Sequence, residues 1–450
     1  MQYENRQGKG ISVETRVKHG GRVRLHHDVV LLFWVIIYVF TSFFTYVTLR
    51  NAEYHLYFGS YFIYEPSLLL LGVSNAIFIL VPALWLFCRK SQNDLFCFVL
   101  LPLVAVGGIC GSIVASLSDP YWWAIITSLY VVLPLALSGI AGGNFTRLKV
   151  VVGHDGRAIL AFVGLIGAAF YFYLSIRYSS QLQLSGLKDA YSTRAEFASL
   201  VSGWERYGIQ FSKYVSAFCA AAYAIERRKP LFLAVPLFIF IVDYLLAAHK
   251  ISLAFSGLIL VFYYWFAHRR LQFNAYYVPA ALSVAQWGVL SVVGTSSAMG
   301  IWAVAFYDRL FMVSSGLFAR YKNFADQNGY FWGGNGLLGR FFDGRTDNPT
   351  HTVGAYYWRE GVSANADFIS DAYINFGFSG ILIAFVVLRL LLGRRDNWLY
   401  RDEGRMLITL MTPYALVLFS VGLQTAMISG GFVFGLILIK VFRFRKTSPL

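Results

Sequence analysis

Charged side chains are scarce in this chain of 450 residues: only 14% are Asp, Glu, Lys or Arg, whereas 57% are hydrophobic. A soluble domain typically carries about 25% charged residues. Apolar runs of about 18 residues or more recur along the whole length, and such a run can span a bilayer as a helix. The shortage of charge therefore excludes an ordinary soluble enzyme and indicates an all-α polytopic membrane protein.

Cysteine is also rare, with four residues in the whole chain. Cys88, Cys97, Cys110 and Cys219 lie in or beside apolar runs, and no pair has C-x-x-C spacing. This pattern argues against both a disulfide framework and a cysteine-based zinc site. The chain also lacks an HExxH pair, a Walker-type glycine loop and the Asp-x-Asp pair typical of metal-dependent enzymes that use nucleotide sugars. We therefore expect no cofactor and no catalytic metal ion.

Twelve apolar segments have the length of a spanning helix. They fall at about 28–48, 67–88, 95–117, 122–143, 158–176, 209–225, 231–248, 251–267, 275–296, 374–392, 406–424 and 428–442. Lys and Arg cluster at the N-terminus and then in every second connection, as in cytoplasmic loops, so both termini are predicted to be cytoplasmic. These loops account for the net charge of +15, and we predict no nucleic-acid partner.

This topology divides the chain into consecutive parts. They are a cytoplasmic N-terminal segment 1–27, nine spans within 28–296, a large outer loop 297–373, three spans within 374–442 and a cytoplasmic tail 443–450. A first outer loop occupies 177–208. Loops as long as 297–373 are usually functional, and its stretch "NGYFWGGNGLLGRFF" suits a folded cap.

Several cations lie on the predicted outer side, where the positive-inside bias disfavours them. Arg194 lies in "YSTRAEF", Lys250 in a short turn after "LLAAH", and both Arg309 and Arg320 in the second outer loop. Guanidinium groups match phosphate oxygens with paired hydrogen bonds. We predict a diphosphate cradle of Arg194, Lys250 and Arg309, with Arg320 as an outlying member. The alternatives are loop charges paired with nearby acids and, for Lys250, a side chain that snorkels to the interface.

Aromatic residues crowd the same outer segments, among them Tyr191 and Tyr321. Aromatic faces can stack on the flat C–H faces of sugar rings. We therefore include these two tyrosines in the predicted substrate site. The alternative is the belt of Tyr and Trp that membrane proteins place at the bilayer interface.

The stretch "NADFISDAYINFGFSG" carries acidic side chains into an apolar run. In a helix from about Ala364, Asp367, Asp371 and Asn375 would share one stripe. Carboxylates at the start of a helix are stabilised by its positive end, which is one explanation. The stripe continues to Asn375, however, so it should face protein or a water-filled cavity. We predict Asp371 as a base or as the partner of Arg309 or Arg194, with Asn375 beside it.

Four motifs, in this order, resemble the bacterial oligosaccharide repeat-unit polymerases, the Wzy-type O-antigen polymerases. They are "YSTRAEF" with the later "GIQFSKY", "AAHKISLAF", "FYDRLFMVSSGLFARYKNF" and "NADFISDAYINFGFSG". The resemblance implies the helical architecture of C-type glycosyltransferases. It also implies an enzyme of the bacterial inner membrane whose active site faces the periplasm.

The same resemblance implies the reaction and the partners. The growing glycan would move from undecaprenyl diphosphate to the terminal sugar of an incoming lipid-linked repeat unit. The further partners would be the lipid bilayer and a chain-length regulator protein. Asp371 and Arg309 are then the predicted catalytic residues. An O-antigen ligase, with His351 of "TDNPTHTVG" as its histidine, is one alternative, and a lipid-linked oligosaccharide flippase is another.

Overall fold

The computed structural model describes residues 36–37, 95–108, 111–112, 115, 120–139, 156–184, 190–268, 277–294, 297, 299–300, 303, 313–334, 344–358, 360, 362–392, 404–428 and 430–441. Helices dominate these residues, and none of them lies in a strand. The predicted all-α class is therefore confirmed for the described part of the chain. Of the predicted spans, 67–88 and nearly all of 28–48 lie outside it.

Apolar helices long enough to cross a membrane occur in four places among the described residues. They are Tyr121–Ser138, Arg157–Arg177, Pro230–Ala247 and Phe368–Leu392. Shorter apolar helices occupy Lys250–Phe266, Val284–Val293 and Ile408–Leu418. Length and composition thus support a helical membrane protein, while the full set of twelve spans stays a prediction.

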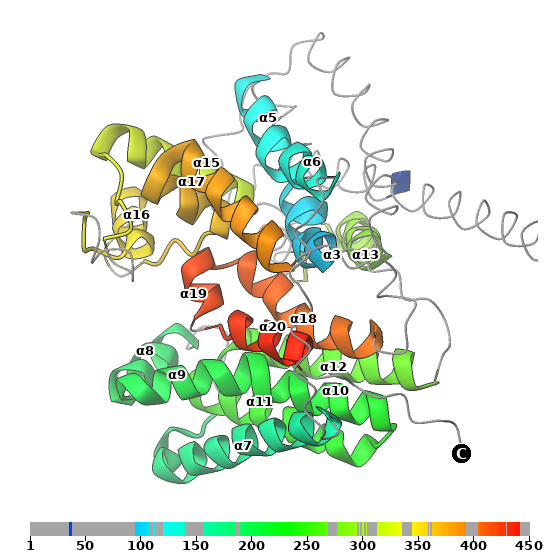
Figure 1. The fold of residues 1–450 in the computed structure, drawn as a ribbon. Coiled ribbons are helices and arrows are strands. Elements are labelled where there is room, and N and C mark those ends of the chain that lie inside the picture. Colours follow the sequence, from blue (N-terminus) through cyan, green and yellow to red (C-terminus); the bar gives the residue numbers. More distant parts are fainter. Residues whose placement is uncertain are drawn as a thin grey trace, which may run out of the picture.

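One group of helices, green in Figure 1, forms what we call the α7–α12 bundle. Its helices are α7 (Gly156–Arg177), α8 (Ala190–Leu200), α9 (Gly203–Phe211), α10 (Ala217–Arg227), α11 (Ala234–Ala247) and α12 (Lys250–His268). A π-helical turn, η4 (Ser212–Ser216), joins α9 to α10, and a 3₁₀ turn, η5 (Pro230–Leu233), precedes α11. Gly164 lets α7 approach α10 closely, because a Cβ there would lie 2.7 Å from the Cβ of Ala220. Small residues commonly allow such contact between membrane helices.

The two ends of the α7–α12 bundle differ in chemistry. Arg157 at the start of α7 pairs with Glu226 near the end of α10, with Nη2 3.0 Å from Oε1. At the opposite end of α7, the backbone N–H of Gln183 donates to the carbonyl of Leu245 at 3.1 Å. The first predicted outer loop therefore lies against the C-terminal end of α11, away from the Arg157–Glu226 pair.

A second group of helices lies beside this bundle. It contains α3 (Leu95–Pro102), η1 (Leu103–Gly108), α5 (Pro120–Thr127), η2 (Ser128–Val132), α6 (Leu133–Gly139), α13 (Tyr277–Val293), α15 (Val313–Asn328), α16 (Pro349–Tyr357) and α17 (Phe368–Leu392). The helices α18 (Gly404–Leu418), α19 (Leu423–Met427) and α20 (Phe432–Val441) lie between the groups, and α18 contacts both α10 and α3. The predicted outer loop 297–373 thus contains helices α15 and α16.

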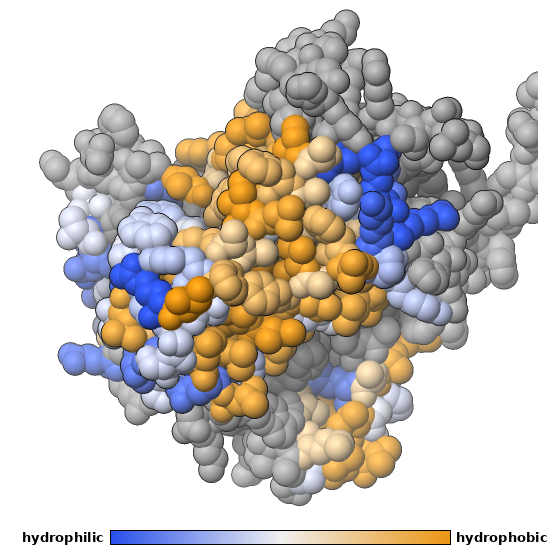
Figure 2. Space-filling view, turned by 90° about the horizontal axis from the view of Figure 1, so that it is seen from below, coloured by the Kyte–Doolittle hydropathy of each residue, from blue (hydrophilic) through white to orange (hydrophobic). Residues whose placement is uncertain are grey.

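A broad apolar surface covers the face of the molecule seen from the α7 side (Figure 2). On α7, Phe162, Leu165, Phe172 and Ile176 are at least half exposed. Exposed apolar surface of this extent marks contact with a membrane or a partner. Lipid contact is the simplest account here, because α7 is itself long and apolar enough to span.

Candidate functional site

A tight turn between α11 and α12 is the centre of the candidate site. Helix α11 ends because Ala248 adopts the left-handed conformation, with φ 49° and ψ 34°. The carbonyl of His249 then accepts a hydrogen bond from the backbone N–H of Ser252 at 2.9 Å, and α12 begins at Lys250. The short turn predicted before Lys250 is confirmed, and the Lys250 side chain is exposed.

Asp243, one turn before the end of α11, organises the side chains beneath this turn. Its carboxylate accepts hydrogen bonds from Tyr171 at 2.7 Å and Ser252 at 2.5 Å, lies 3.0 Å from Nδ1 of His249, and is 3.8 Å from Nζ of Lys213. Only 2% of the Asp243 side chain and 3% of the Lys213 side chain are exposed. A buried charge is tolerated only when it is paired and hydrogen-bonded, and Asp243 meets both conditions.

Arg194 reaches this corner from the first predicted outer loop. It lies on α8, and its Nη2 donates to the carbonyl of Ala248 at 3.3 Å. Lys250 follows two residues later in the chain. The structure therefore brings Arg194 next to the turn that carries Lys250, while the cradle itself stays a prediction.

Two other predicted site residues cannot be placed in this corner. Arg309 lies outside the described residues, as does the side chain of Tyr191 in the first turn of α8. The part of the cradle assigned to Arg309 therefore stays a prediction.

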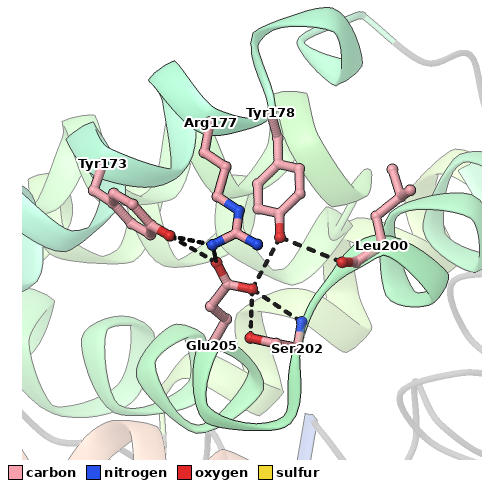
Figure 3. A network of polar contacts seen from close by, with 6 residues as sticks. All are labelled: Tyr173, Arg177, Tyr178, Leu200, Ser202 and Glu205. Carbon is pink, nitrogen blue, oxygen red and sulfur yellow. Dashed lines mark hydrogen bonds and ion pairs between the residues drawn. The ribbon is translucent and has the colours of Figure 1, made fainter.

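A second polar network lies at the same end of the bundle (Figure 3). The buried carboxylate of Glu205 pairs with Arg177 at 3.1 Å and accepts hydrogen bonds from Tyr173 at 3.2 Å, Tyr178 at 2.9 Å and the Ser202 hydroxyl at 2.6 Å. Burial alone would raise the pKa of Glu205, but the hydrogen bonds outweigh it and hold the pKa below its ordinary value. Arg177, the last residue of α7, is thus a cation paired with an acid, which is the alternative to a ligand-binding role.

The start of α17 forms a different kind of site in the second group of helices. Asp367 precedes the helix, and its Oδ1 accepts hydrogen bonds from both the backbone N–H and the hydroxyl of Ser370, each at 2.9 Å. Asp367 therefore acts as a helix cap, as its position suggested. Tyr321 is buried nearby, and its hydroxyl donates to the carbonyl of Ala364 at 2.6 Å.

Asp371 lies one turn further along α17 and is partly buried. Within the described parts of the chain, its carboxylate has no hydrogen bond or ion pair. It packs against Gly422, where an added Cβ would lie 2.2 Å from Oδ2. The expected pairing with Arg194 is therefore not found, and the pairing with Arg309 stays a prediction because Arg309 is not described.

Asn375 holds a break in α17 rather than an open site. Its Oδ1 accepts the backbone N–H of Gly333 at 2.9 Å, and its Nδ2 donates to the Asp371 carbonyl at 2.8 Å. Immediately after it, Phe376 and Gly377 leave helical geometry, with Gly377 at φ 63° and ψ −152°. Both polar groups of the side chain are thus engaged within the protein, and this role depends on Gly333, which is far from Asn375 in the sequence.

Arg320 belongs to this second group of helices and not to the corner at Ala248. It is buried, and its guanidinium lies 4.5 Å from the ring centre of Trp358 and 5.1 Å from that of Tyr357. Stacking on aromatic faces is a common use of arginine. Nothing in these contacts joins Arg320 to Arg194 or Lys250, so its membership of the cradle stays a prediction.

Sequence reasoning missed Lys213, Asp243 and His249. A signal was present, because Lys213 and Asp243 are single charges inside apolar runs, which usually face a partner or a cavity. His249 directly precedes Lys250, which was predicted to be part of the cradle. The distribution of charges alone, however, does not reveal which helices bring the three together.

Neither a family model, nor a curated protein, nor a solved structure matches this chain.

Proposed function

We propose that this protein is a membrane glycosyltransferase that polymerises lipid-linked oligosaccharide repeat units. In this reaction the growing glycan leaves undecaprenyl diphosphate and joins the terminal sugar of the incoming unit. The observation that carries the proposal is the meeting of Arg194 with the Ala248–Lys250 turn, 3.3 Å from Nη2 to the Ala248 carbonyl. Two cations from separate segments thereby lie at one end of a bundle of apolar helices.

The chemistry of a lipid diphosphate fits these cations. Its departure develops negative charge on the phosphate oxygens, and fixed cations at that place lower the barrier. A lipid-linked donor also keeps its diphosphate near the end of spanning helices, where this corner lies. The hydrogen bonds and ion pair of Asp243 hold the turn in place, which keeps the cations in position before the substrate arrives.

The proposal includes an orientation in the membrane. The end of the bundle with the Arg157–Glu226 pair also carries Arg227, Arg228 and Lys229, a cluster typical of the cytoplasmic side. The Ala248 corner would then face the periplasm, with twelve spans in the inner membrane and both termini in the cytoplasm. A chain-length regulator and the lipid bilayer complete the expected partners.

Deletion of the gene in the organism that carries it tests the proposed function. We expect surface glycan with a single repeat unit in place of a ladder on a gel, because polymerisation alone is lost. Loss of all repeat units from the lipid A core would instead indicate a ligase. Lipid-linked precursor retained inside the cell would indicate a flippase.

The cradle has its own test in the complemented deletion strain. Arg194→Gln should lower polymerisation by about 10²-fold, the usual cost of removing one stabilising donor. Arg206→Gln is the matched control, since Arg206 is an exposed arginine on α9 that donates to the Ala198 carbonyl at 2.8 Å. A full ladder from Arg194→Gln at normal protein level would contradict the cradle.

A further inference from the structure

We infer that His249 is the general base that takes the proton of the acceptor sugar hydroxyl, and that Asp243 positions it. This inference rests on the proposed function and adds a residue to the site that the Arg194–Lys250 cations form. It begins from the contact between Nδ1 of His249 and Oδ2 of Asp243 at 3.0 Å. A carboxylate behind an imidazole is the arrangement that orients catalytic histidines in several unrelated enzymes.

The partners of Asp243 fix which nitrogen of His249 carries the proton. The carboxylate is ion-paired with Lys213 and accepts hydrogen bonds from Tyr171 and Ser252, so it is ionised and can only accept. Nδ1 of His249 must therefore be the donor. The lone pair of a neutral imidazole is then on Nε2, and no residue of the described chain makes a hydrogen bond to that atom.

The place of His249 allows this nitrogen to meet a substrate. About 22% of the side chain is exposed, in contrast to the buried Asp243 and Lys213 behind it. His249 lies between Ala248, whose carbonyl accepts a hydrogen bond from Arg194, and Lys250. A diphosphate held by these two cations would bring its attached sugar beside the imidazole.

The charged surroundings favour the neutral form that a base needs. Burial lowers the pKa of His249, and Lys213 and Arg194 lower it further, while Asp243 opposes them. The other titratable groups around the network are Tyr171 and Tyr214, with the exposed Lys250 next in the chain. The net direction leaves His249 unprotonated at neutral pH.

The step that follows is balanced. The acceptor hydroxyl oxygen forms a bond to the anomeric carbon of the donor glycan as its proton passes to Nε2 of His249. The bond from that carbon to the phosphate oxygen breaks, and the electron pair leaves with the undecaprenyl diphosphate. His249 then returns its proton to solvent, so no oxidant, reductant or further reactant is needed.

Reconstituted full-length protein provides the test, with lipid-linked single repeat units extracted from the deletion strain as substrate. His249→Asn is the informative variant, because its amide nitrogen can replace Nδ1 as donor to Asp243 but nothing replaces Nε2. We expect a rate lower by about 10²- to 10⁴-fold with an unchanged melting temperature. Because the pKa of His249 is lowered, chiefly by burial, the wild-type rate should also fall at a pH more acidic than the ordinary titration of histidine, and the residual rate of His249→Asn should lack that decline.

The outcomes separate this inference from the proposed function. If wild-type protein makes polymer and His249→Asn makes it at the same rate, His249 is not the general base, and the proposed polymerase function is unaffected. If wild-type protein makes no polymer from this substrate, the proposed function fails first. Should His249→Asn not accumulate, His249→Gln takes its place, and a wild-type rate or an unchanged pH profile in that variant would overturn the inference.

Discussion

Asp243 and Asp371 each place a carboxylate in a helix that is apolar enough to span a membrane, yet their surroundings differ. Asp243 has Tyr171, Ser252, His249 and Lys213 around it. Asp371 has no such partner among the described residues and packs against Gly422. An acid in an apolar run is therefore not a site by itself. Its partners decide whether it organises a corner of the fold or stands alone.

Removal of the charge at Asp243 should have the largest effect on stability. Asp243→Asn leaves Lys213 buried without its counter-charge, and breaking a buried pair in this way costs about 3–5 kcal/mol. We expect a strongly lowered melting temperature in detergent and little protein in the membrane. A variant Asp243→Asn as stable as the wild type would show that the charge of Asp243 does not hold this corner of the fold together.

Tyr171→Phe is the matched control for this prediction. It removes one hydrogen bond to Asp243 and leaves the ion pair with Lys213 in place, so the expected loss is only about 1–3 kcal/mol. A loss as large as that of Asp243→Asn would show that the tyrosine, and not the charge pair, holds the corner.

The break in α17 should give an intermediate effect. Gly377 lies at φ 63° and ψ −152°, a region that is essentially restricted to glycine, so Gly377→Ala should cost about 1–3 kcal/mol. Gly288→Ala is the control, because α13 is helical there and, beyond the backbone of that helix, no atom of the described residues lies within 4 Å of the added Cβ. That change should leave the free energy of unfolding equal or higher by up to about 1 kcal/mol, and so the melting temperature equal or slightly raised. Equal effects from the two variants would remove the special role of the break.

The two regions also differ in how far the sequence could predict them. Apolar runs placed the helices well, as with α7 at Gly156–Arg177 against a predicted 158–176, because length and hydropathy are local properties. The short turn before Lys250 was predicted for the same reason. The helix-capping role of Asp367 could also be predicted, because its partner Ser370 is only three residues away in the sequence.

What the sequence could not predict depends on contacts between distant segments. Lys213 and Asp243 lie on different helices, and nothing local pairs them. Glu205 had several possible cationic partners, and only the packing of α9 against α7 selects Arg177. The break at Gly377 is stabilised by a hydrogen bond from the backbone of Gly333 to the Asn375 side chain. The apolar pattern of "INFGFSG" is that of a continuous helix, so it did not predict the break.

Removal of the charge at Asp371 should have the smallest effect. Asp371→Asn gives up the attraction of a carboxylate to the start of its helix, worth about 0.3–1 kcal/mol. It also relieves the cost of a partly buried charge that has no partner among the described residues, and the two changes oppose each other. The backbone contacts survive, because the Asn375 amide donates to the carbonyl of residue 371 and not to its side chain. We therefore expect a melting temperature close to that of the wild type, measured beside Asp243→Asn in the same detergent. A loss near that of Asp243→Asn would mean that Asp371 has a cationic partner, with Arg309 the first residue to test by a double-mutant cycle.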